Sequence, residues 1–270
     1  MDIVSADIVS PVFFSYVVIG VVALLASALT FFSGFGLGTL LLPAFALFVP
    51  VEQAVALTAI VHFLNNLLKL GLIGRHADWR IVWRFGVPAI VMSVAGAALL
   101  IWLGRIAPVY DYSAFGHELA VTPIKLVMGV LLLLFAAIEL VPRLRDRTFG
   151  TEYMPLGGAL SGFFGGLSGM QGALRSAFLA RAGLSKEAFI GTGVVIACLI
   201  DVSRLGVYAT SVIAQRATLD LGLLAVAIVA AFAGAVLGNR HLHKVTMPGV
   251  QKLVALLLVL IAFGLIAGIL

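Results

Sequence analysis

Several apolar stretches of the chain carry polar side chains that can bind a charged ligand or move a proton. The stretch at residues 52–73 contains His62, Asn65 and Asn66, and His62 would lie about 15 Å from its start if the stretch were helical. Such side chains are costly in apolar surroundings, so they are candidates for a functional site. Alternatively, they join neighbouring helices by hydrogen bonds. Lys69 is close enough to the end of the stretch to extend its ammonium group outward.

Charged side chains also lie inside apolar stretches in the second half of the chain. Arg175 lies one helical turn from Gln171, and its planar guanidinium group can pair with an anion; alternatively, it extends out of the end of its stretch. Asp201 and Arg204 are three residues apart and so share one face of a helix. They form either an internal ion pair, which is the simpler interpretation, or a site at which the carboxylate couples proton movement.

Two glycine-rich breaks, at residues 33–43 and 165–175, interrupt the apolar stretches and must position these groups. A helix that begins at such a break presents unpaired N–H groups and a partial positive charge, which favour an anion. Alternatively, small residues allow close helix packing, but two breaks at matched positions favour a ligand site. The residues of the breaks that we expect to bind a ligand are Ser33, Gly34, Gly36, Gly38, Thr39, Ser168, Gly169, Gln171 and Gly172, in addition to Arg175.

The composition is that of a chain that lies within a membrane. Hydrophobic residues make up 62% of the chain and charged residues 11%, whereas soluble domains carry about 25% charged residues. Apolar runs of about 20 residues recur along the whole length, so the spanning elements are helices rather than the strands of a barrel. The net charge of +5 is concentrated in short loops, which is typical of a membrane protein and not of a nucleic-acid-binding surface.

The positions of the basic loops predict the topology. Basic residues cluster at 75–84, 143–147 and 240–244, and we expect these loops to be cytoplasmic. Both termini are then outside a bacterial inner membrane. The apolar segments that we expect are 12–32, 37–49, 52–73, 81–103, 123–141, 153–167, 169–182, 186–208, 221–238 and 250–270.

The two halves of the chain have the same order of segments. A shift of 134 positions aligns Gly38 with Gly172 and Thr58 with Thr192. The halves start on opposite sides of the membrane, so we expect an all-α polytopic membrane protein built from two inverted repeats, at residues 1–142 and 143–270 of a single membrane domain. Each repeat is a glycine-broken short-helix pair followed by three spanning helices. Inverted repeats place a ligand site at their interface.

The motifs of several enzyme classes are absent from the sequence. It has no GxxxxGK[ST] phosphate-binding loop, no HExxH and no GxSxG, and His241 with His243 are too few for a metal site. We therefore expect neither a cofactor nor a metal. The sequence favours a transporter, with a passive anion channel as the alternative. An intramembrane enzyme is a third interpretation, which requires His62 and Asp201 to meet beside a nucleophile.

Three sequence patterns, in this order, give a resemblance to a known family. The run Gly34-Phe35-Gly36-Leu37-Gly38-Thr39-Leu40-Leu41-Leu42-Pro43 resembles the GxGGGxxxxP signature of the sulfite exporter TauE/SafE family, also called the 4-toluene sulfonate uptake permease family. Asp78-Trp79-Arg80 resembles the end of the family's basic loop. The third pattern is made of Leu184, Lys186, Glu187 and Phe189, followed by Thr192, Asp201 and Arg204. The chain departs from the family's pattern at Leu37 and at Met170-Gln171, where the family usually has glycine or proline.

The resemblance covers nearly the whole chain and implies a function. It implies a secondary transporter of small sulfur-containing anions, such as sulfite, sulfonates or sulfoacetate, that works without ATP. The expected partners are the small anionic substrate and the lipid bilayer, with no nucleic acid; a homo-oligomer is left open. The residues expected to bind the anion are those of the two breaks together with His62, Asn65 and Asn66.

Overall fold

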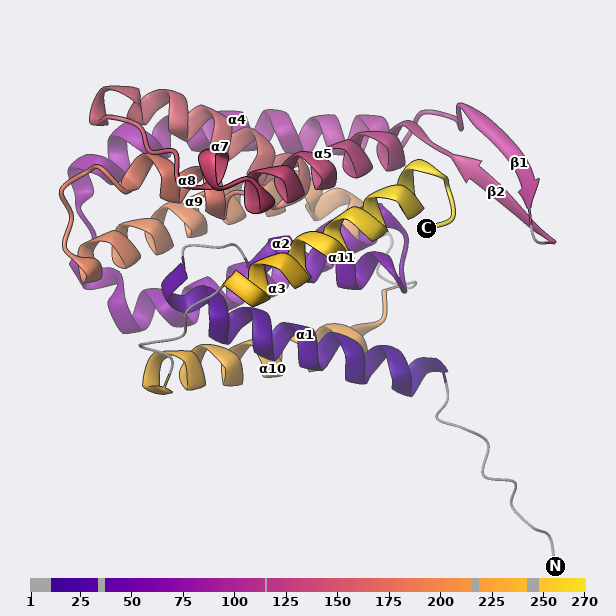
Figure 1. Cartoon of the computed structure of the whole chain (residues 1–270), viewed down its shortest axis with the longest axis horizontal. Coiled ribbons are helices and arrows are strands. Elements are labelled where there is room, and N and C mark those ends of the chain that lie inside the picture. The colour runs from indigo at the N-terminus through magenta and orange to yellow at the C-terminus, as the bar shows by residue number, and fades with distance from the viewer. Residues whose placement is uncertain (1–10, 34–36, 115, 215–218, 242–247) are drawn as a thin grey trace, which may run out of the picture.

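The computed structural model describes residues 11–33, 37–114, 116–214, 219–241 and 248–270, and almost all of the structure is helical (Figure 1). The α-helices are α1 (Pro11–Ser33), α2 (Leu37–Ala46), α3 (Val51–Ile73), α4 (Trp79–Leu103), α5 (Pro123–Leu140), α6 (Pro142–Arg145), α7 (Met154–Ser168), α8 (Gly172–Leu179), α9 (Lys186–Ala214), α10 (Leu221–His241) and α11 (Pro248–Ile266). Six of them, α1, α3, α4, α5, α9 and α10, are long and apolar enough to cross a membrane. The expectation of an all-α polytopic membrane protein is confirmed.

The loop between α4 and α5 forms a small β-hairpin that the sequence analysis did not anticipate. Strand β1 (Tyr110–Ala114) pairs antiparallel with β2 (His117–Val121). The Tyr112 hydroxyl donates to the Ala267 carbonyl at 2.5 Å, and Lys125 Nζ donates to the Gly268 carbonyl at 3.2 Å. The hairpin and the end of α11 therefore lie together at one end of the molecule, as Figure 1 shows.

Local capping explains where several helices begin and end. The Asp78 side chain accepts hydrogen bonds from the backbone N–H groups of Arg80 and Ile81 and so caps α4. Gly169 ends α7 because its φ of +80° is left-handed, a conformation that glycine adopts without strain. The second short helix is therefore shorter than expected, since it starts only at Gly172.

The long helices pack in pairs that bring together distant parts of the sequence. α4 packs mainly against α7, α1 against α10, and α5 against α11. α3 and α9 pack against each other and lie between the α1–α10 pair and the α4–α7 pair (Figure 1).

Glycines allow backbone-to-backbone contact in two of these pairs. A Cβ atom added to Gly162 of α7 would lie 2.1 Å from the Ala89 carbonyl oxygen of α4, and one added to Gly234 of α10 would lie 2.2 Å from the Leu24 carbonyl oxygen of α1. Gly158 and Gly166, four residues before and after Gly162, make the same close approach to α4. These helices are therefore held together by contacts that any side chain at the glycine positions would block.

Each glycine-broken pair of helices folds back on itself. The ring of Phe14, near the start of α1, meets the ring of Phe48, just after α2, with centroids 6.3 Å apart. In the second pair, Phe149, before α7, stacks on Phe178 of α8 with centroids 4.4 Å apart. The Phe149 N–H also donates to the Ala177 carbonyl. The short helices α2 and α8 thus each return towards the end where the preceding helix began.

Candidate functional site

The completely buried Asp201 carboxylate is the centre of a polar cluster between α3 and α9. Its Oδ2 atom accepts hydrogen bonds from His62 Nδ1 at 2.7 Å and from Asn66 Nδ2 at 3.2 Å. His62 and Asn66 are one turn apart on α3, so both side chains face α9. The sequence predicted that His62 and Asn66 share a face, and it raised a meeting of His62 with Asp201 only as the requirement of the enzyme interpretation.

The other oxygen of Asp201 joins the cluster to the second glycine break. Oδ1 accepts from Arg204 at 3.0 Å (Nε) and 2.8 Å (Nη2), and from Gln171 Nε2 at 3.3 Å. Asp201 and Arg204 are both completely buried, and a buried charge is stable only with such a partner. The internal ion pair predicted for Asp201 and Arg204 is therefore present, and it is one part of a larger network.

Gln171 connects Asp201 to the guanidinium group of Arg175 on α8. Its side-chain oxygen accepts from Arg175 Nη1 at 3.3 Å, and its backbone carbonyl accepts from the Ser161 hydroxyl at 3.1 Å. Arg175 is half-buried and lies along α9, with its Nε atom 3.4 Å from where a Cβ atom of Gly193 would be. Arg175 thus faces the protein interior. The His62, Asn66, Gln171, Arg175, Asp201 and Arg204 side chains are called the Asp201 cluster below.

The two glycine breaks meet directly beside the Asp201 cluster. A Cβ atom added to Gly38, in the first turn of α2, would lie 2.8 Å from the carbonyl oxygen of Gly169 and 3.6 Å from Thr58 of α3. Gly169 in turn lies against Arg204, whose Nη1 atom donates to the Gly165 carbonyl at 3.3 Å. The breaks contact each other so closely at Gly38 that even a methyl group has no room there.

The other residues of the two glycine breaks fall into three groups. Thr39 and Gly172 are buried at the starts of α2 and α8. The Ser168 hydroxyl donates to the Phe164 carbonyl at 2.9 Å, so it serves the end of α7. Gly34, Gly36 and the side chain of Ser33 are outside the described residues.

Asn65 lies in a different cluster from its neighbour Asn66. It contacts the Ser27 hydroxyl of α1 at 3.1 Å. The Asn65 amide nitrogen donates to the Ala231 carbonyl of α10 at 3.2 Å, and the Asn65 amide oxygen accepts from Lys69 Nζ at 3.3 Å. Asn65 therefore joins α1, α3 and α10, and Lys69, which was expected to extend outward, is buried. Like His62, Ser27 is a polar residue in an apolar stretch, and this signal could have identified it.

We expect the alanine variants of Asn65 and Asn66 to differ: one should mainly lose stability and the other should mainly lose transport. Asn66→Ala removes a hydrogen bond to Asp201 and is expected to lower transport about tenfold, because the loss of a bond to a charged group costs about 1.5–3 kcal/mol. Asn65→Ala is expected mainly to lower the temperature of thermal unfolding, because it removes the hydrogen bonds that join α3 to α1 and α10. Flux and thermal unfolding of both purified variants test this contrast; equal effects on both readouts would contradict it.

The side chains of the Asp201 cluster carry more positive than negative charge. Among the six side chains of the cluster, Arg175 and Arg204 contribute two guanidinium groups, while Asp201 contributes one carboxylate. An excess of buried positive charge is costly unless a negative group accompanies it. The Nδ1–H group of His62 donates to the Asp201 carboxylate, so this ring nitrogen is used within the cluster. The cluster is therefore suited to an anion.

His62 and Asp201 meet one of the two requirements of an intramembrane enzyme. They are in hydrogen-bond contact, but among the described residues no hydroxyl is bonded to His62. The serines Ser27, Ser93 and Ser161 donate instead to Asn65 or to backbone carbonyls. The described residues also contain no group of three or more side chains able to hold a metal ion.

Comparison with protein-family models gives a match over most of the chain. The family model described as sulfite exporter TauE/SafE matches residues 19–265, which include all eleven α-helices in whole or in part. No curated protein and no solved structure matches the chain.

Proposed function

Because the chain belongs to the sulfite exporter TauE/SafE family, we propose that it is a secondary transporter that moves a small sulfur-containing anion, such as sulfite, a sulfonate or sulfoacetate, across a bacterial inner membrane. The observation that carries the proposal is the Asp201 cluster, where two guanidinium groups and one carboxylate lie at the meeting point of the two glycine breaks. Sulfur oxyanions have several acceptor oxygens in a compact shape, which suits guanidinium and amide donors.

The packing of the helices supports two related halves. If α1–α5 correspond in order to α7–α11, then α1 is equivalent to α7 and α4 is equivalent to α10. The α1–α10 pair is then equivalent to the α7–α4 pair, and both pairs have extensive contacts. The α3–α9 and α5–α11 pairs are each unchanged by the exchange. The inverted repeat at residues 1–142 and 143–270 explains this pattern, and it places both termini outside when the basic loops are cytoplasmic.

The cluster also offers a mechanism for transport. The side chains of Asp201, Arg204 and Gln171 are completely buried, and the breaks are in contact at Gly38, so the structure is closed at the site. An anion bound by Arg175 and Gln171 would offset the positive charge of the two guanidinium groups. Movement of α3 relative to α9 would then open the site to one side.

Transport of labelled sulfite into proteoliposomes tests the proposal. Purified protein is expected to give saturable uptake that is reduced by unlabelled sulfonates. Empty liposomes and protein with Asp201 replaced by asparagine provide the controls. If no sulfite, sulfonate or sulfoacetate moves and none raises the temperature of thermal unfolding, the proposed substrate class is wrong.

A passive anion channel is the second candidate, because the same cluster could line a pore. A counterflow experiment distinguishes a carrier from a channel. A carrier loaded with unlabelled anion accumulates labelled anion transiently, whereas a channel shows no such accumulation and gives ohmic currents. The close contact of the breaks at Gly38 favours the carrier, since it leaves no continuous opening at that point.

A further inference from the structure

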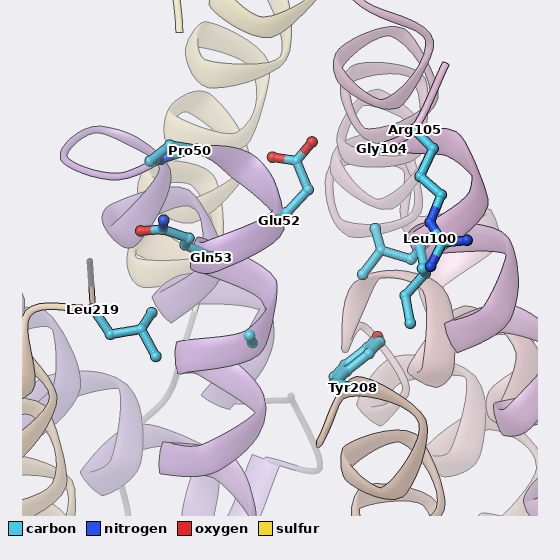
Figure 2. A pocket seen from close by; sticks show the side chains of 10 residues that line it. Pro50, Glu52, Gln53, Leu100, Gly104, Arg105, Tyr208 and Leu219 are labelled. Atoms are coloured by element: carbon cyan, nitrogen blue, oxygen red, sulfur yellow. The ribbon is translucent and has the colours of Figure 1, made fainter. Parts of the chain in front are cut away.

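A pocket of about 370 Å³ opens between the start of α3, the end of α4 and the later part of α9 (Figure 2). It lies apart from the side chains of the Asp201 cluster and was not anticipated from the sequence. Its lining residues that matter below are Glu52 and Ala56 of α3, Arg105 after α4, and Tyr208 of α9.

The mouth of the pocket carries one acidic and one basic side chain. Figure 2 shows Glu52 on the wall formed by α3 and Arg105 on the opposite wall. Arg105 is exposed and Glu52 half-buried. An ion that enters the pocket therefore passes close to both charges, and its rate of entry must depend on each of them.

The floor of the pocket is connected to the Asp201 cluster. Tyr208 is buried, and its hydroxyl donates to the carbonyl of Gly166, at the second glycine break. Arg204 lies four residues earlier on the same face of α9 and donates to the neighbouring carbonyl of Gly165. Tyr208 and Arg204 are thus neighbours on α9, about 6 Å apart along the helix axis.

We infer that this pocket is the entrance through which a small anion reaches the Asp201 cluster from this end of the molecule, and that Arg105 is the residue that attracts it. The inference rests on the proposed function and adds an access route with a residue that selects by charge. Glu52 limits the attraction, so its neutralisation should increase the entry of anions. Tyr208 forms the barrier between the entrance and the cluster.

A single reporter cysteine tests whether the pocket is on the route. Ala56 lines the pocket one turn inside Glu52, so Ala56→Cys places a thiol in the path. The anionic reagent 2-sulfonatoethyl methanethiosulfonate is expected to modify this variant and to block sulfite uptake. The unmodified sequence, whose single cysteine Cys198 is buried, is one control. Val109→Cys, at an exposed position outside the pocket lining, is the other, and its modification should leave uptake unchanged.

The charges at the mouth are tested by the rate of modification in the Ala56→Cys background. Adding Arg105→Gln is expected to slow the anionic reagent about threefold or more at low ionic strength, and high salt should remove the difference. Adding Glu52→Gln should speed the same reagent. Arg143→Gln, in a basic loop remote in sequence, is the matched control and should change nothing. With a cationic methanethiosulfonate, Arg105→Gln should speed the modification and Glu52→Gln should slow it.

The outcomes separate this inference from the proposed function. If modified Ala56→Cys protein still transports at the normal rate, or if the thiol is not modified, the pocket is not the entrance, although the transporter proposal stands. If the wild-type protein transports no anion, the proposed function fails, but the rates of modification still show whether Arg105 attracts anions into the pocket. Equal rates for Arg105→Gln and Arg143→Gln would overturn the role of Arg105.

Discussion

Replacing Asp201 by asparagine is expected to abolish anion transport and to lower stability more than any other single change in the cluster. Asp201 accepts two hydrogen bonds from Arg204 and one each from His62, Asn66 and Gln171. Arg204 is completely buried, and removal of one partner from a buried ion pair costs about 3–5 kcal/mol because the other charge is left uncompensated. Thermal unfolding in detergent and sulfite uptake in proteoliposomes measure the two effects.

The double variant provides the control for this prediction. Asp201→Asn combined with Arg204→Gln removes both charges, so it is expected to unfold at a higher temperature than Asp201→Asn alone. It should nevertheless remain inactive, because the cluster no longer has its carboxylate. If Asp201→Asn is as stable and as active as the unmodified protein, the ion pair has neither of the roles assigned to it.

Replacing Gly162 by alanine is the change for which we expect the second-largest effect. Its Cβ atom would lie 2.1 Å from the Ala89 carbonyl oxygen and 2.6 Å from the Ala89 Cα atom, so α4 and α7 must separate. Alanine normally stabilises a helix by about 1 kcal/mol relative to glycine, but overpacking costs about 1–3 kcal/mol. We expect a net loss of stability and of folded protein in the membrane, measured by thermal unfolding and by the yield of monodisperse protein.

Gly206 of α9 is the matched control for Gly162. It is exposed, and a Cβ atom added there meets nothing within 4 Å. Gly206→Ala should therefore keep or slightly raise the temperature of unfolding. If both alanine variants shift this temperature in the same direction, the close approach of α4 and α7 does not determine stability.

The sequence was sufficient to predict most of the helices and the residue types of the site. Long apolar runs indicate helices whatever their neighbours are, and glycine spacing shows where a helix is interrupted. The spacing of His62 and Asn66 also predicted their shared face. The family resemblance, carried by the run at 34–43 and by residues 78–80, is confirmed by the match over residues 19–265.

The sequence could not show which helices meet. Asn65 and Asn66 are adjacent and chemically identical, yet one contacts α1 and α10 while the other contacts α9; the difference depends on the packing of helices far apart in the chain. For the same reason the sequence allowed Lys69 to extend its ammonium group outward, although the structure shows it to be buried. The link from Tyr208 to Gly166 likewise depends on the approach of α9 to α7, which no local pattern encodes.

Binding of labelled sulfite to purified protein is the most direct test of the claim that the cluster at the two glycine breaks holds an anion. Arg175 and Arg181 are six residues apart, but Arg175 contacts Gln171 whereas Arg181 is exposed. The unmodified protein and Arg181→Gln are predicted to bind sulfite saturably with equal affinity. Arg175→Gln should bind at least about tenfold more weakly, because a charge-assisted hydrogen bond is lost. Equal affinities for Arg175→Gln and Arg181→Gln, with both proteins folded, would contradict the claim.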